Sequence, residues 1–117
     1  MESDGLKRTP EQSVGAVLGQ LENIIVSRKT AAADRSYTSK LFAGGVAKIG
    51  SKVTEEAEEL VEAAANESDE RVVSEAADLL YHTIVLLAHR DLKISQVETA
   101  LAGRFGVSGL EEKASRK

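Results

Sequence analysis

The chain has 117 residues and a formal net charge of −4, and 42% of its residues are hydrophobic while 3% are aromatic. This length fits one domain, and the acidic balance argues against a nucleic-acid-binding surface. With no cysteine, a disulfide scaffold, a thiolate zinc site and a cysteine nucleophile are excluded.

The first eight residues are polar, and we expect them to be flexible. They contain no apolar signal core, and no apolar run in the chain is long enough to span a membrane, so we expect a cytoplasmic protein. Thr9 and Pro10 form a good helix start, and apolar residues then recur at helical spacing. A helix is therefore predicted from Pro10 to about Ser27.

Residues 28–39 have no apolar period and contain several capping residues, which predicts a connector. Ser36 or Thr38 is placed to cap a short helix that runs through Phe42. Gly44 and Gly45 then permit a bend before the next helix.

Apolar residues at helical spacing predict a helix over about residues 46–65, which Gly50 and Ser51 weaken enough to permit a kink. The next predicted helix, over about residues 69–90, is the most apolar. Between residues 76 and 88 its only readily charged residues are Asp78 and His82. A helix with so few charges is expected to be buried on most sides.

Ser95 and Glu98 have the spacing of a capping box, which predicts a short last helix that ends near Gly103. Residues 105–117 form a charged, glycine-punctuated tail that alone would be disordered or depend on a partner. No segment alternates like a strand, so residues 1–117 are predicted to form one all-α domain. We expect its helical hairpins to form a four-helix-bundle-like core completed by a homodimer, since each hairpin has more apolar surface than one chain covers.

The stretch of residues 52–82 carries two acidic stripes, because residues three and four apart share a helix face. If the first helix ends near residue 65 and the second begins near residue 69, the two stripes lie level across an antiparallel hairpin. Glu59 and Glu75 are then each about 9 Å from the turn, and Glu56 and Asp78 each about 13 Å. Four carboxylates converging in this way repel one another and need a cation between them.

A row of glutamates on a helix is most often only a solvated face, so the helix position of Asp78 decides the interpretation. Asp78 lies between alanines and leucines on the most apolar helix, and a buried carboxylate needs a partner. That partner is either a structural salt bridge to Lys48 or Lys52, or a shared metal ion. Ligands that are all oxygen favour Mg²⁺, with Mn²⁺ also possible.

Three other residues near the stripes have weaker signals. Lys52 lies one turn before Glu55, where it could hold a phosphate oxygen or simply pair with Glu56. His82, four residues after Asp78, is expected to support a ligand rather than bind metal itself. Tyr81 is expected in the core or at an interface, and no Walker-type glycine loop is present.

The acidic pattern Glu55-Glu56-x-x-Glu59, followed after fifteen residues by Glu75-x-x-Asp78, resembles the signature of the MazG-like all-α nucleoside-triphosphate pyrophosphohydrolases. Four flanking segments narrow the resemblance to the phosphoribosyl-ATP pyrophosphohydrolase family of histidine biosynthesis. These segments are SYTSKL (Ser36–Leu41), KVTEEAEE (Lys52–Glu59), EAADLLYH (Glu75–His82) and SGLEEKASR (Ser108–Arg116).

This resemblance implies hydrolysis of phosphoribosyl-ATP to phosphoribosyl-AMP and pyrophosphate. It implies that Mg²⁺ is bound by four carboxylates, those of Glu56, Glu59, Glu75 and Asp78. It also implies that Glu55 is a further ligand or orients the attacking water, and that Lys52 contacts the triphosphate.

Other basic residues are candidate phosphate contacts, namely Lys40, Lys48 and Arg35. In the tail, Lys113 and Arg116 could close over the substrate or a neighbouring subunit. Two alternatives stay open: a house-cleaning enzyme that acts on dUTP or damaged nucleotides, and a non-catalytic helical interaction module. No nucleic-acid or membrane partner is expected.

Overall fold

The computed structural model describes residues 10–30 and 35–106, with side chains from residue 16 onward. These residues form helices and no strand, which confirms the predicted all-α class. The four helices are α1 (Pro10–Lys29), α2 (Tyr37–Asn66), α3 (Asp69–His89) and α4 (Ile94–Ala102). Among them, none is long and apolar enough to cross a membrane.

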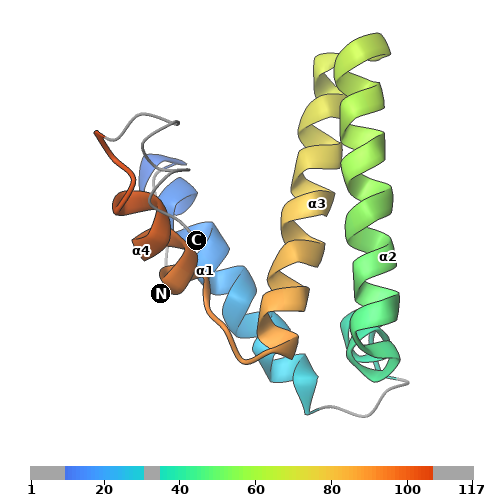
Figure 1. Ribbon diagram of the computed structural model, residues 1–117, viewed down its shortest axis with the longest axis vertical. Coiled ribbons are helices and arrows are strands. Elements are labelled where there is room, and N and C mark those ends of the chain that lie inside the picture. Colours follow the sequence, from blue (N-terminus) through green and yellow to red (C-terminus); the bar gives the residue numbers. More distant parts are fainter. Residues whose placement is uncertain (1–9, 31–34, 107–117) are drawn as a thin grey trace.

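Helices α2 and α3 form a long antiparallel hairpin, which stands upright in Figure 1. The link between them is only Glu67 and Ser68. The Ser68 hydroxyl accepts a hydrogen bond from the Arg71 backbone N–H at 3.2 Å and so caps α3. This tight, capped turn fixes the register of the two helices, and its place agrees with the prediction from the sequence.

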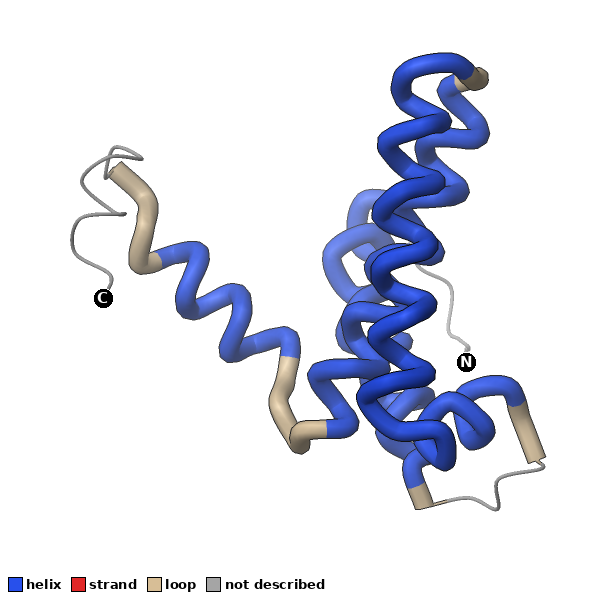
Figure 2. The backbone as a smooth tube through the Cα atoms, turned by 45° about the vertical axis from the view of Figure 1, so that its right-hand side comes forward, coloured by secondary structure: helices blue, strands red, loops and turns tan. Residues whose placement is uncertain are grey.

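The core lies at the base of the hairpin, where α1 crosses the start of α2 and the end of α3 (Figures 1 and 2). It is built from apolar side chains of these three helices: Ile25, Leu41, Ile49, Ile84, Val85 and Ala88. Above this base, α3 packs chiefly against α2, and Val73 and Leu80 are 68% and 49% exposed. The expectation that α3 is buried on most sides is therefore wrong for the single chain.

The start of α2 follows the sequence signals closely. Ser36 is its N-cap, and the Ser36 hydroxyl accepts a hydrogen bond from the Ser39 backbone N–H at 3.0 Å. Gly45 has φ 70° and ψ −166°, a conformation that only glycine adopts readily, and it bends the helix as predicted. At Gly50 and Ser51 the helix continues unbroken, so the kink expected there is wrong. A helical glycine costs only about 1 kcal/mol, which the burial of neighbouring Ile49 offsets.

Helix α4 begins two residues earlier than the predicted capping box requires. Its N-cap is Lys93, whose backbone N–H donates to the Gln96 side chain at 2.8 Å. The Ile94 N–H donates to the Glu22 carboxylate of α1 at 2.7 Å. The predicted box between Ser95 and Glu98 is wrong because this long-range contact fixes the helix start. The cap at Gly103 agrees with the predicted end.

Some predictions fall outside the described residues. These concern the flexible first eight residues, most of the tail over residues 105–117, and the roles of Lys113 and Arg116.

Candidate metal centre

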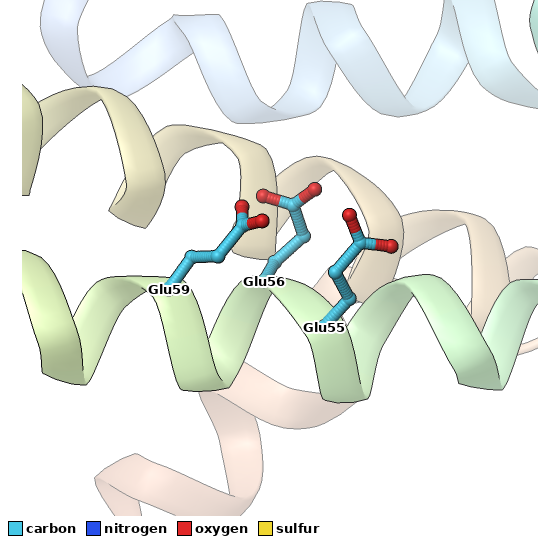
Figure 3. A group of neighbouring side chains, drawn as sticks. All are labelled: Glu55, Glu56 and Glu59. Carbon is cyan, nitrogen blue, oxygen red and sulfur yellow. The ribbon is translucent and has the colours of Figure 1, made fainter.

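The hairpin brings the carboxylates of the two acidic stripes together. One oxygen from each of Glu56, Glu75 and Asp78 lies within 4.8 Å of the other two, and the same holds for Glu55, Glu56 and Glu59. Glu56 belongs to both groups. Figure 3 shows the three α2 glutamates reaching from one side of that helix toward α3. The convergence predicted from the helix register is present, while the metal-binding roles remain predictions.

The two groups together form an acidic cluster of five residues: Glu55, Glu56, Glu59, Glu75 and Asp78. The sequence indicated Asp78 as its buried member, but the structure buries two others. Asp78 is exposed, as are Glu55 and Glu59, whereas Glu56 and Glu75 are only 6% and 3% exposed. Asp78 is open to solvent because this part of α3 packs chiefly against α2. The prediction that Asp78 is the buried carboxylate is therefore wrong. A buried carboxylate still requires a partner, and this requirement applies to Glu56 and Glu75.

Two oxygen atoms in the cluster, Glu56 Oε1 and Glu75 Oε1, are buried and have no hydrogen-bond partner among the described residues. Ionised carboxylates only accept hydrogen bonds, so neither oxygen can satisfy the other without a proton or a cation. Burial, together with the nearby carboxylates of Asp78 and Glu59, raises the pKa of Glu56 to about 7. Desolvation by the surrounding groups and the neighbouring Glu75 also raise the pKa of Glu59. The cluster is therefore short of positive charge.

Two basic side chains touch the edges of the cluster. Lys52 Nζ lies 3.2 Å from Glu55 Oε1, so Lys52 pairs with Glu55 rather than with Glu56. Arg71 forms an ion pair with Glu75 and a second one with Glu67, at 3.2 Å. Arg71 was missed in the sequence, although the spacing of Glu67, Arg71 and Glu75 is that of helical ion pairs. In the described part of the chain, no ion pair joins Asp78 to a lysine.

The other basic candidates do not reach the cluster through any contact between described residues. Arg35, Lys40 and Lys48 are all exposed. The Lys48 side chain folds back along α2 over Gly44, where a side chain at that position would meet it. Their proposed contacts with phosphate therefore stay predictions.

A second network ties the start of α2 to α3 one turn beyond Asp78. His82 is buried, and its Nδ1 lies 2.9 Å from the Asp78 carbonyl oxygen. A carbonyl only accepts, so Nδ1 carries the proton and Nε2 accepts from the Tyr37 hydroxyl at 2.8 Å. The Thr38 and Tyr81 hydroxyls form a neighbouring hydrogen bond. Both nitrogens of His82 are thus used within the protein, in keeping with a supporting role.

Tyr37 was missed as a functional candidate, although its segment, SYTSKL, was singled out in the sequence. The Tyr37 ring stacks on Tyr81, with 6.3 Å between ring centroids. Tyr81 also packs against the core, as expected. No local pattern could pair Tyr37 with His82, because 45 residues separate them.

Comparison with known proteins places the chain in a family. A family model described as phosphoribosyl-ATP pyrophosphohydrolase matches residues 18–105. A phosphoribosyl-ATP pyrophosphatase of Trichlorobacter lovleyi is 50% identical over 101 residues, which cover 86% of this chain and 94% of that protein.

Two further relatives carry the same name. The protein of Rhodopirellula baltica is 48% identical over 103 residues, which cover 82% of this chain and 85% of the relative. The protein of Vesicomyosocius okutanii subsp. Calyptogena okutanii is 43% identical over 100 residues, which cover 86% of this chain and 95% of the relative. The chain therefore belongs to the phosphoribosyl-ATP pyrophosphohydrolase family.

Proposed function

We propose that this protein hydrolyses phosphoribosyl-ATP to phosphoribosyl-AMP and pyrophosphate, the second step of histidine biosynthesis. The observation that carries this proposal is the pair of buried carboxylate oxygens, on Glu56 and Glu75, that lack a hydrogen-bond partner among the described residues. They lie in a chain whose relatives are named phosphoribosyl-ATP pyrophosphatase. A phosphoanhydride is highly charged, so its cleavage depends on neutralising that charge and on an in-line water.

The donor set of the cluster fits a hard divalent cation. Every candidate ligand is a carboxylate oxygen, the type that Mg²⁺ and Mn²⁺ prefer. We propose that Mg²⁺ is held by four residues: Glu56, Glu59, Glu75 and Asp78. When bound, the ion would neutralise charge on the triphosphate and lower the pKa of a water molecule.

The remaining cluster residues are proposed to act on the water and the phosphates directly. Glu55 is exposed beside Glu56 on the same face of α2, where its carboxylate can accept a hydrogen bond from the attacking water. Lys52 can turn from Glu55 to a phosphate oxygen, since a half-exposed ion pair is weak. Other positive charge near the phosphates would come from exposed side chains: Lys40, Lys48 and Arg35.

A substrate comparison tests this function. The purified chain is incubated with phosphoribosyl-ATP or with dUTP, each with Mg²⁺ or with a chelator, and pyrophosphate release is measured. We expect release from phosphoribosyl-ATP that stops when the metal is chelated. Turnover of dUTP alone would indicate a house-cleaning pyrophosphohydrolase, and no turnover of either would indicate a non-catalytic helical module.

We further propose that the protein works as a homodimer. The single chain leaves large apolar side chains exposed on the hairpin, among them Val46, Val61, Val73 and Leu80. An apolar groove continues from Leu80 between α1, α3 and α4. A second copy that covers these faces would complete a four-helix core. Light scattering should give about twice the chain mass of 12.5 kDa, and a monomer at micromolar concentration would contradict the proposal.

A further inference from the structure

Arg71 links the turn of the hairpin to the acidic cluster. Its Nε lies 3.2 Å from Glu67 Oε1, and its Nη2 contacts Glu75 Oε2. Its backbone N–H donates to the Ser68 hydroxyl at 3.2 Å. The guanidinium therefore spans from Glu67 in the link to Glu75 in α3, and it bridges one carboxylate outside the cluster and one inside it.

This contact determines which oxygen of Glu75 is available. Arg71 occupies Oε2, so Oε1 is the oxygen left over. Oε1 is the atom that is buried without a hydrogen-bond partner, and Glu75 belongs to the group it forms with Glu56 and Asp78. The Glu75 side chain is only 5% exposed, so water cannot readily replace Arg71 as its partner. Glu75 is thus prepared to offer one oxygen to a ligand inside the cluster.

We infer that Arg71 is a positioning residue: by holding Glu75 Oε2, it fixes Oε1 as a single-oxygen ligand facing Glu56 and Asp78. This inference rests on the proposed function, because the species that Glu75 Oε1 would bind is the divalent cation. Glu67 has an indirect part, since it holds the other edge of the guanidinium.

Two opposing effects decide what loss of Arg71 does to cation binding. Its positive charge repels a cation, but the side chain is 54% exposed and the repulsion is screened by solvent. Against this, a freed Glu75 carboxylate can rotate or share a proton with Glu56, and both states compete with the cation. Loss of a group that orients a metal ligand typically weakens binding by about 10- to 100-fold, so positioning should outweigh repulsion.

The test is a Mn²⁺ titration of the full chain without substrate, in which electron paramagnetic resonance measures the free ion. We expect Arg71→Gln to weaken Mn²⁺ binding at least about tenfold. Arg71→Lys should recover part of the lost Mn²⁺ affinity, because lysine keeps the charge but cannot contact Glu67 and Glu75 with two separate nitrogens. Arg90→Gln is the matched control: it removes the same charge from the far end of α3, about 28 Å away. The affinity of Arg90→Gln for Mn²⁺ should equal that of the wild type.

A second readout separates positioning from general damage. Excess Mg²⁺ should restore the activity of Arg71→Gln toward that of the wild type. Circular dichroism of the metal-free variant should show the wild-type helix content, which a folding defect would lower. Glu67→Gln loosens Arg71 without altering the cluster, and should weaken Mn²⁺ binding by a smaller factor. This variant and Arg71→Lys carry the test if Arg71→Gln does not fold.

Mn²⁺ binding by Arg71→Gln that equals or exceeds that of the wild type would overturn the inference and leave Arg71 as a counter-charge only. Unchanged binding by both Arg71→Lys and Glu67→Gln would overturn it equally. If the wild type binds no Mn²⁺, the metal centre itself fails, and this inference falls with it. The two failures are therefore distinguishable.

Discussion

Glu59→Gln and Asp78→Asn should each lower kcat/KM for phosphoribosyl-ATP by at least about a hundredfold while the protein stays folded. Each residue contributes one oxygen to one of the two carboxylate groups. An amide keeps the shape of the side chain but removes the negative charge that holds a cation. Both residues are exposed, so the free energy of unfolding should change by no more than about 0.5 kcal/mol.

Glu58→Gln is the control for these two variants. Glu58 is exposed on α2 directly beside Glu59, but it lies in neither carboxylate group. It should retain full activity, and circular dichroism should show the same helix content in all variants. If Glu59→Gln and Asp78→Asn both turn over substrate at the wild-type rate, the assignment of the metal ligands is wrong.

Glu56→Gln should abolish activity and yet stabilise the metal-free protein. The folded-state pKa of Glu56 is raised from 4.5 to about 7, chiefly by burial. Between these two pH values the folded protein holds a proton that the unfolded chain releases, so stability is lost as pH rises through about 7. The raised pKa of Glu59 acts in the same direction. A neutral amide at position 56 does not titrate and can donate a hydrogen bond to a neighbouring carboxylate.

Urea unfolding with a chelator present measures this effect. At pH 8, Glu56→Gln should exceed the wild type in free energy of unfolding by about 1 to 3 kcal/mol, an advantage that nearly disappears at pH 5. Adding Mg²⁺ at pH 8 should stabilise the wild type and not the variant, because only the wild type binds the ion. Equal destabilisation of Glu56→Gln at both pH values would show that position 56 is an ordinary buried side chain.

The hairpin and its acidic cluster could be predicted because their determinants are local. Helical periodicity placed the acidic residues on single faces, and the polar residues before Asp69 marked the turn. Two helices joined by so short a link must run antiparallel, so equal counts from the turn bring Glu59 level with Glu75. The bend at Gly45 falls in the Gly44-Gly45 pair that was predicted to permit one, for an equally local reason.

The errors and omissions depend on contacts between distant parts of the chain. The exposure of Asp78 follows from what covers α3, which its own sequence does not show. The start of α4 is fixed by Glu22, 72 residues earlier. Tyr37 and His82 are likewise far apart in sequence. Arg71 is different: its ion pairs with Glu67 and Glu75 are local, and their spacing of four residues is visible in the sequence.

The most direct test of the metal centre is anomalous X-ray diffraction from crystals of the wild-type protein grown with Mn²⁺. An anomalous peak is predicted between Glu56 Oε1 and Glu75 Oε1, the two buried oxygens without a hydrogen-bond partner among the described residues, with Asp78 beside it. A crystal that shows Mn²⁺ elsewhere and none between these oxygens would contradict the account.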